Sequence, residues 1–272
     1  MSKEFGFWKM HGAGNDFVLV DDREAVFPVR DAAWLRALCA RRSGVGADGV
    51  ILIRKSGTAD FRMVFFNPDG TRAAMCGNGA RCAARLACEE GIAPASMALE
   101  TDAGVLHAEV RGAQVLLEMT PPEDWRLDAR LTLDGTEIPY GYINTGVPHV
   151  VVERPDLGRT DVLGLGSRIR HHPDFAPAGT NANFVAVTGP DTLSVRTYER
   201  GVESETLACG TGIVASALVC VLTQRVSAPV QVRCAHGDVL TVDCEVAGGA
   251  PRNVTLRGPA EHVFRGTLSY RA

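Results

Sequence analysis

The chain has 272 residues, of which 46% are hydrophobic and 22% charged, with a formal net charge of −4. This composition is typical of a folded globular protein with one large domain or two smaller ones, and it excludes disorder as the main state. Because no block of lysine and arginine appears, we expect no nucleic-acid partner. The N-terminal residues lack an apolar signal segment, and the longest apolar run, Ile213–Leu222, is too short to cross a bilayer. We therefore expect a cytoplasmic protein with no membrane partner.

In chain order, short β-branched runs between glycine, proline, asparagine and aspartate predict strands. These runs are residues 17–20, 50–53, 61–66, 106–110, 115–119, 150–152, 184–187, 193–198, 239–242 and 254–256. Helices are predicted at Trp34–Arg41, Gly77–Glu89 and Gly210–Leu222. The last of these is apolar on all sides, so we expect it to be buried all round.

A weak internal repeat with a period of about 133 residues runs through the chain. Five blocks of the first half recur in the same order in the second: Gly14–Val20 with Gly146–Val152, Gly49–Ile53 with Asn183–Val187, Phe66–Gly70 with Tyr198–Val202, Met75–Gly79 with Ala208–Gly212, and Gly104–Leu106 with Gly237–Leu240. A period of this length indicates a duplicated domain rather than a solenoid.

The repeat and the predicted elements together define a fold class. We predict an α+β fold of two pseudo-symmetric domains, each a curved, mostly antiparallel sheet wrapped around a central helix. The first domain is expected at 1–119, completed by a C-terminal strand at 266–272, and the second at 120–265. The join falls near the proline pair that follows Thr120.

The eight cysteines stand at positions 39, 76, 82, 88, 209, 220, 234 and 244. In a cytosolic protein they are expected to be thiols. No Cys-x-x-Cys pair occurs, and Cys76, Cys82 and Cys88 follow one another at intervals of six, unlike zinc ligands. We predict no metal site.

The segment Gly44-Val-Gly46-Ala-Asp-Gly49 matches the glycine pattern of dinucleotide-binding loops. That pattern requires a strand before it and a helix after it. Here the predicted strand at 50–53 follows the glycines, so the order is wrong. We predict a mobile glycine loop and no nucleotide cofactor.

The repeated motif Cys-Gly-x-Gly, at Cys76 and Cys209, carries the chemistry. Each copy places a thiol at the start of a predicted helix, where backbone N–H groups and the helix dipole favour an anion. The same field stabilises a thiolate. The other six cysteines fit an ordinary buried role, but repetition of thiol and glycines together is poorly explained by packing.

Two thiols facing one carboxylate site would suit two-base chemistry. A thiolate removes a carbon-bound proton on one face, a thiol delivers a proton on the other, and the configuration inverts. The developing enolate-like charge would lie on the two helix N-termini. This reaction needs no pyridoxal phosphate, and Lys3, Lys9 and Lys55 lie in no obvious Schiff-base context. We expect no cofactor.

The sequence resembles the diaminopimelate epimerase family along nearly its whole length. The resemblance rests on Met10–Phe17, Gly44–Gly49, Asn67–Gly70, Met75–Cys82, Gly146–His149, Thr180–Phe184 and Tyr198–Gly212. Proline racemases share the paired cysteines but carry histidine after the first Cys-Gly, where this chain has Asn78. The resemblance implies an isomerase that interconverts LL- and meso-diaminopimelate in lysine and peptidoglycan precursor synthesis, and it implies a homodimer.

The resemblance also implies roles for individual residues. Cys76 and Cys209 would be the acid/base pair, tuned by His149 and Glu199. The reacting carboxylate would be held by backbone N–H groups of Gly77, Asn78, Gly210 and Thr211. The distal end of the substrate would be held by Asn15, Asn67, Asn181 and Arg200, with Glu199 also at the substrate.

Two departures from the family pattern affect these assignments. Val147 stands where the family often has a substrate-binding asparagine. The segment from Glu199 to Cys209 is one residue longer than its counterpart from Asn67 to Cys76, within Gly201–Glu205.

Three alternatives remain open at the level of sequence. The first is a racemase of another amino acid, from which Arg200 would distinguish a substrate with a second charged end. The second is a thiol redox or sensor protein that forms a Cys76–Cys209 disulfide. The third is an amino-acid-binding module that exchanges no α-proton.

Overall fold

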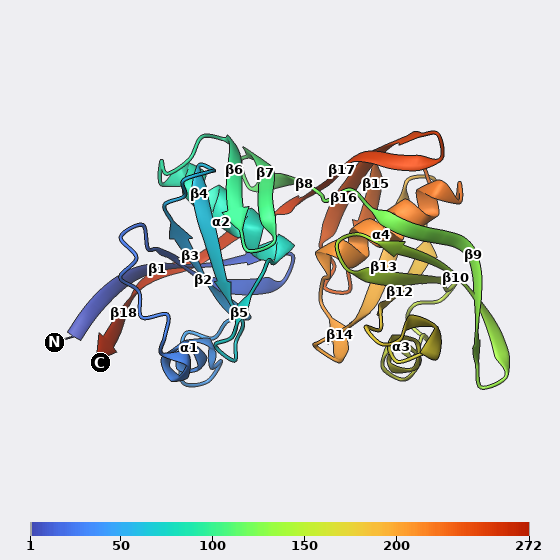
Figure 1. Ribbon diagram of the computed structural model, residues 1–272, viewed down its shortest axis with the longest axis horizontal. Coiled ribbons are helices and arrows are strands. Elements are labelled where there is room, and N and C mark those ends of the chain that lie inside the picture. The colour runs from blue at the N-terminus through green and yellow to red at the C-terminus, as the bar shows by residue number, and fades with distance from the viewer. Residues whose placement is uncertain (1, 272) are drawn as a thin grey trace. The chain divides into compact units, whose positions relative to one another are not determined.

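The computed structural model describes residues 2–271 and divides into two compact units. The first unit comprises Met1–Leu117 and Gly258–Ala272, and the second comprises Glu118–Arg257. Each unit is a sheet with one helix against its concave side (Figure 1), which confirms the predicted α+β class. No helix in the described range is long and apolar enough to span a membrane.

The first unit is built on a sheet in which β1 (Ser2–Gly12) is central. It pairs antiparallel with β18 (Glu261–Arg271) and with β2 (Asn15–Asp21). Strand β2 runs parallel to β3 (Gly49–Arg54), which pairs antiparallel with β4 (Phe61–Phe66). The sheet continues through β5 (Arg72–Ala73), β6 (Ser96–Thr101), β7 (Gly104–Arg111) and β8 (Gln114–Glu118).

The second unit repeats this order. Strand β9 (Glu123–Leu133) pairs antiparallel with β10 (Thr136–Asn144), and β10 pairs with β11 (Pro148–Glu153). Strand β11 is parallel to β12 (Asn181–Val187), which pairs antiparallel with β13 (Thr192–Glu199). The remaining strands are β14 (Ser204–Thr206), β15 (Val230–Arg233), β16 (Val239–Ala247) and β17 (Ala250–Pro259).

The strand registers define the duplication more sharply than the sequence does. Phe17 lies opposite Gly49 in the first unit, and His149 lies opposite Asn181 in the second, so both pairs are related by 132 residues. The second sequence block was therefore aligned two residues out of register, since Gly49 corresponds to Asn181 and not to Asn183. All the strands predicted from β-branched runs are present.

The central helices have the predicted bounds. They are α2 (Gly77–Glu89) and α4 (Gly210–Leu222), and both are drawn inside their sheets in Figure 1. Residues 212–220 of α4 are buried without interruption, as its apolar sequence predicts. The second glycine of each motif allows this packing. A Cβ on Gly79 would lie 2.7 Å from the Ile51 Cδ1 atom, and one on Gly212 would lie 2.4 Å from the Asn183 Oδ1 atom.

Helix α1 (Ala32–Cys39) begins two residues before the predicted start because the Asp31 side chain caps it. Helix α3 (Val162–Arg170) and the short helix η1 (Pro173–Phe175) were not predicted. Helix α3 contains Gly164 and Gly166, which weaken its helical pattern. Gly166 packs against Tyr198, where a Cβ would approach within 2.4 Å of the tyrosine Cβ.

The glycine loop before β3 follows helix α1 and precedes a strand, so its order is not that of a dinucleotide site. The predicted mobile loop is better described as an anchored one. The Gly46 and Ala47 N–H groups donate to the carbonyls of Leu38 and Cys39 at 3.0 and 3.1 Å. A Cβ on Gly44 would lie 1.9 Å from the Ala37 carbonyl oxygen, so the glycine is required by close approach to α1.

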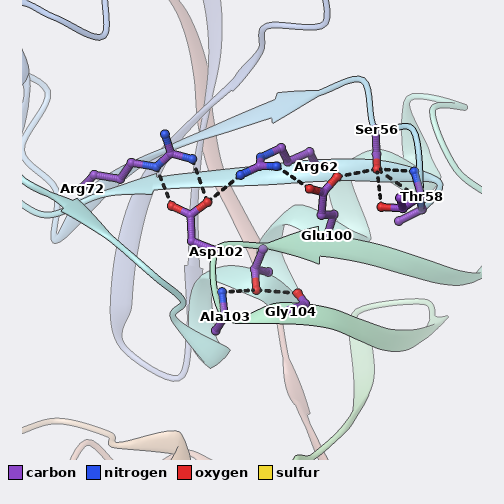
Figure 2. A network of polar contacts seen from close by, with 10 residues as sticks. Ser56, Thr58, Arg62, Arg72, Glu100, Asp102, Ala103 and Gly104 are labelled. Carbon is purple, nitrogen blue, oxygen red and sulfur yellow. Dashed lines mark hydrogen bonds and ion pairs between the residues drawn. The ribbon is translucent and has the colours of Figure 1, made fainter.

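A network of ion pairs fixes the short strand that leads to Cys76 (Figure 2). Arg72 of β5 donates two hydrogen bonds to Asp102, at 2.5 and 2.7 Å. Arg62 of β4 bridges Asp102 and Glu100, and Ser56 donates to Glu100 at 2.6 Å. These contacts join the β4–β6 edge to β5, four residues before Cys76.

Candidate active site

Cys76 is the N-cap residue of α2. Its backbone is extended, with φ −143° and ψ 117°, and its carbonyl accepts the first helical hydrogen bond, from Ala80 N–H, at 2.8 Å. The Cys76 side chain does not cap the helix. Because the first N–H groups of a helix have no partner within it, they can bind an anion beside the thiol. A Cβ on Gly77 would meet no atom within 4 Å, so packing does not require this glycine and the space is open.

Cys209 repeats this arrangement at α4. It is the N-cap residue, also with an extended backbone, and its carbonyl accepts from Ile213 N–H at 2.9 Å. Its Sγ lies 3.5 Å from the Thr211 hydroxyl, on the first turn of the helix. Gly210 and Thr211 are half-buried, and the Cys209 residue is 9% exposed. Both predicted thiols therefore occupy helix N-termini in their own units.

Of the other six cysteines, Cys39, Cys82, Cys220 and Cys234 are buried as predicted, whereas Cys88 and Cys244 are half-buried. Burial raises the pKa of Cys39 to about 11, and the pKa values of Cys82 and Cys220 to about 12. Burial also raises the pKa of Cys244. These thiols stay protonated at neutral pH and are poor bases.

Glu199 lies beside the Cys209 thiol, at the end of β13. Burial raises the pKa of the Glu199 carboxyl, and a hydrogen bond with the Cys209 thiol opposes this shift. Glu205, on the neighbouring strand, accepts two hydrogen bonds of 2.7 Å from Arg196. Glu199 forms no ion pair with an arginine among the described residues. Its raised pKa makes the carboxylate a stronger base, which suits proton exchange with a thiol.

The extra residue between Glu199 and Cys209 is accommodated in the turn that follows Glu199. In the first unit, the Asn67 carbonyl accepts from the N–H of Gly70, three residues later, at 2.9 Å. In the second unit, the Glu199 carbonyl accepts from the N–H of Glu203, four residues later, at 2.8 Å. The extra residue widens the turn, and α4 still begins directly after Cys209.

A directed chain of side chains holds Asn15 and Asn78. The fully buried Arg81 Nη2 donates to Asn78 Oδ1 at 2.9 Å, and Asn78 Nδ2 donates to Asn15 Oδ1. Asn15 Nδ2 then donates to Asp48 Oδ2 at 3.1 Å. Arginine can only donate and a carboxylate only accept, so the two ends fix both amide orientations. Arg81 and Asp48 were not predicted as site residues, although both lie inside the matching motifs.

Asp48 is itself held by charged neighbours. Arg41 forms ion pairs of 2.6 and 2.8 Å with Asp48 and Asp16, and Lys9 lies 2.6 Å from Asp16. Burial by itself would raise the pKa of Asp16, but hydrogen bonds and charges from Arg41 and Lys9 outweigh it and lower the pKa to about 2. Asp16, which shares Arg41 with Asp48, is therefore ionised at neutral pH.

Asn67 lies at the turn after β4, half-buried. Its Nδ2 donates to the Thr71 hydroxyl at 3.2 Å. In the second unit, Asn181 is 3% exposed, and its side chain hydrogen-bonds to backbone groups. Its Oδ1 accepts from Arg200 N–H at 2.8 Å, and its Nδ2 donates to the Pro148 carbonyl at 3.1 Å. One amide proton of each asparagine remains for another acceptor.

The Arg200 side chain is half-buried and donates to the Ala178 carbonyl at 3.3 Å. No described carboxylate forms an ion pair with it, so a guanidinium remains available for a carboxylate ligand. Val147 occupies the position that corresponds to Asn15, 132 residues earlier, and is half-buried. The polar group that the family often has at Val147 is thus present only in the first unit.

His149, at the start of β11, has no exposed surface. Burial lowers the pKa of His149 to about 3, and the positive charge of Arg200 acts in the same direction. The ring is therefore neutral across the physiological range and can act as a donor or an acceptor, but not as a stored positive charge.

In each unit the arrangement combines a thiol, a helix N-terminus and amide side chains. Such a site can bind a carboxylate and exchange a proton at the adjacent carbon. Asn15, Asn67, Cys76, Gly77 and Asn78 lie in the first unit, and the remaining predicted residues lie in the second.

Known proteins with related sequences and folds define the class. A family model described as diaminopimelate epimerase matches residues 7–125 and 141–263. The diaminopimelate epimerase of Aquifex aeolicus is 47% identical, covering 97% of each chain, and that of Chlorobaculum tepidum is 43% identical, covering 96% of this chain and 100% of its own. A phenazine biosynthesis PhzF-family protein of Bacillus anthracis has the same fold at 17% identity, with a TM-score of 0.74 over 98% of this chain and 99% of its own.

The duplicated fold and these relatives define an amino-acid isomerase of the epimerase class. More particularly, the chain belongs to the diaminopimelate epimerase family.

Proposed function

We propose that this protein interconverts LL- and meso-diaminopimelate by two-base proton transfer between Cys76, Cys209 and one α-carbon. The single observation that carries the proposal is a thiol at the N-cap of the central helix in each half of a duplicated fold. Family membership supports the substrate.

In the proposed reaction, one thiolate takes the α-proton and becomes a thiol. The other thiol gives its proton to the opposite face of the carbanion and becomes a thiolate. No proton is gained or lost overall, and the configuration inverts. The substrate carboxylate lies on the N–H groups of Gly77, Asn78, Gly210 and Thr211, where developing negative charge is stabilised. Because the pKa of Glu199 is raised, its carboxylate takes the Cys209 proton more readily.

The distal end of diaminopimelate is assigned to Arg200, Asn181, Asn15 and Asn67. Arginine binds a carboxylate through two parallel hydrogen bonds, so the second carboxylate pairs with Arg200. The amide groups bind the remaining polar atoms of that end. The protein acts without a cofactor as a cytoplasmic homodimer, in lysine and peptidoglycan precursor synthesis. Sedimentation of purified protein measures the oligomeric state.

The decisive experiment is incubation of purified protein with LL-diaminopimelate in D₂O. Inversion with deuterium uptake at one α-carbon supports the proposal. Binding without exchange indicates an amino-acid-binding module, and turnover of other amino acids in preference to diaminopimelate indicates a different racemase. Thiol–disulfide exchange without inversion indicates a redox protein.

A further inference from the structure

Equivalent positions in the two units hold side chains of opposite character. Strands β2, β3 and β4 have the same registers as β11, β12 and β13, displaced by 132 residues throughout. The register pairs Ile51 with Phe65 in the first unit and Asn183 with Thr197 in the second. The triad Phe17, Ile51 and Phe65 thus corresponds to the triad His149, Asn183 and Thr197.

In the first unit this triad is ordinary apolar core. The rings of Phe17 and Phe65 meet edge to face at 6.0 Å between centroids, and Ile51 is fully buried beneath Gly79 of α2. The fold therefore accepts a hydrophobic triad at this place. A polar triad in the second unit is not required by packing, and burying it costs free energy unless each polar group is paired.

In the second unit the triad is a chain of hydrogen bonds centred on Asn183. The side chain is fully buried beneath Gly212, the residue equivalent to Gly79. Asn183 Nδ2 lies 2.9 Å from the Val150 carbonyl oxygen and 3.1 Å from His149 Nδ1. The Thr197 hydroxyl donates to Asn183 Oδ1 at 2.9 Å.

These neighbours leave one orientation for the Asn183 amide. The Val150 carbonyl can only accept, so the group facing it must be the NH₂. The second proton of that NH₂ then points to His149 Nδ1, which must accept it with a lone pair. A neutral ring that accepts at Nδ1 carries its proton on Nε2. Protonation of Nδ1 would set two donors against each other.

The Nε2 atom of His149 is fully buried and has no hydrogen-bond partner among the described residues. A buried N–H without a partner is costly, and such an exception indicates a missing ligand or a reacting group. The charged neighbour that acts on the ring is Arg200.

We propose that Asn183 is a positioning residue that holds His149 as the neutral tautomer with its proton on Nε2. The ring then presents a fixed N–H donor to an anion of the reaction, a thiolate or the substrate carboxylate. The inference rests on the proposed function for the identity of that anion, but its effect on the ring does not.

The test observes the ring directly in protein labelled with ¹⁵N at histidine. Two-bond ¹H–¹⁵N spectra distinguish the bare from the protonated ring nitrogen, and Asn183→Asp, Asn183→Leu and Thr197→Val are compared with wild type. His149→Gln identifies the His149 signals among the seven histidines. We expect wild type to carry its proton on Nε2. In Asn183→Asp the carboxylate accepts from Nδ1–H, so the proton moves to Nδ1 and the pKa of His149 rises.

Asn183→Leu keeps the size of the side chain but cannot donate, so the tautomer should no longer be fixed. We expect kcat to fall roughly 10²-fold, with a smaller change in KM, the scale of a misplaced proton-transfer group. Thr197→Val is the matched control. It also removes a buried polar group, but the Val150 carbonyl still orients the amide, so stability falls and the tautomer stays.

An unchanged Nε2–H tautomer in both Asn183 variants would overturn the inference, as would an Nδ1–H tautomer in wild type. The double variant His149→Phe/Asn183→Ile copies the apolar pair of the first unit. We expect it to fold with a melting temperature near that of wild type, and to lose epimerisation. If wild type fails to epimerise diaminopimelate, the proposed function falls, while the spectra still decide what Asn183 does to the ring.

Discussion

The thiols at residues 76 and 209 are distinguished by position rather than by residue type. Each stands at the N-cap of a central helix, whereas Cys82 and Cys220 lie inside those helices with pKa values raised to about 12 by burial. A cysteine that acts as a base needs the thiolate, and a helix N-terminus favours it. The two thiols proposed as the acid/base pair and the inert thiols thus lie on the same helices but in different environments.

Cys76→Ala and Cys209→Ala should each abolish epimerisation, by roughly 10³-fold or more, because either face of the α-carbon then lacks its acid or base. Turnover and the melting temperature are measured together, and the fold should persist. Cys88→Ala is the control, a half-buried thiol near the end of α2 that should keep normal turnover. Near-normal turnover in either N-cap variant would contradict the two-base mechanism.

Arg200→Met should weaken kcat/KM by roughly 2–5 kcal/mol of transition-state binding, because it leaves one substrate carboxylate unpaired. The distal end also orients the α-carbon, so kcat should fall as KM rises. The variant should prefer diaminopimelate less strongly over amino acids with one carboxylate. Steady-state kinetics on both substrates measure this, with Arg168→Met as an exposed control on α3. A wild-type kcat/KM would show that another residue binds the distal end.

The buried His149 makes a distinct contribution to acid sensitivity. Its pKa is about 3 when folded, against an unperturbed value of 6.5. Between these values the unfolded chain binds the extra proton, so the free energy of unfolding falls as the pH falls. The slope approaches about 1.4 kcal/mol per pH unit from this group alone. The free energy of unfolding, measured with urea across pH 4–7, should depend less on pH in His149→Phe than in wild type. An equal pH dependence in the two proteins would mean that the wild-type ring is protonated in the folded state.

At the scale of elements, each central helix approaches its sheet through one glycine. The first-unit glycine, Gly79, faces the flexible end of Ile51, which can move aside. The second-unit glycine, Gly212, faces Asn183 Oδ1, whose amide is held by three hydrogen bonds. A methyl group added at Gly79 should therefore be tolerated better than one added at Gly212, although the two glycines occupy equivalent positions on their helices.

Gly212→Ala should destabilise the protein by about 1–3 kcal/mol and reduce turnover, because the methyl group displaces Asn183. Gly79→Ala should cost less, since Ile51 can change rotamer. Chemical denaturation and kinetics of both variants give the comparison. A smaller stability loss for Gly212→Ala than for Gly79→Ala would show that the Asn183 amide is not rigidly held.

The sequence predicts elements whose signal is local. The bounds of α2 and α4 follow from Cys-Gly-x-Gly and the residues after it, and β3 follows from the unbroken apolar run Val50–Ile53. Helix α3 was missed because two glycines interrupt it, and its stability comes from the Asp161 cap and the contact with Tyr198. A C-terminal strand was predicted to complete the first domain, but no local pattern indicates that this strand begins at Glu261 and pairs with β1.

At the scale of the whole molecule, duplication produced two similar units with different site residues. The first unit has Phe17 and Asn67 where the second has His149 and Glu199, so at these two equivalent positions only the second unit has ionisable side chains. The second unit has Val147 where the first has Asn15. The strand registers make Asn183 equivalent to Ile51, whereas the sequence repeat aligns Asn183 with Gly49, two residues away.

Reversible oxidation tests whether the two units cooperate at one carbon. Thiols that act on opposite faces of the same α-carbon should be able to bridge when no substrate separates them, whereas cysteines with Cα atoms more than about 7 Å apart cannot bridge without backbone movement. Diamide should therefore take two electrons and two protons from Cys76 and Cys209, form one disulfide and abolish activity. Dithiothreitol should restore the activity, and bound substrate should slow its loss.

Peptide mapping identifies the cysteines joined by the disulfide, and Cys88→Ala should behave as wild type. Full activity after diamide, or inactivation through a different cysteine pair, would contradict the arrangement that the two-base reaction requires.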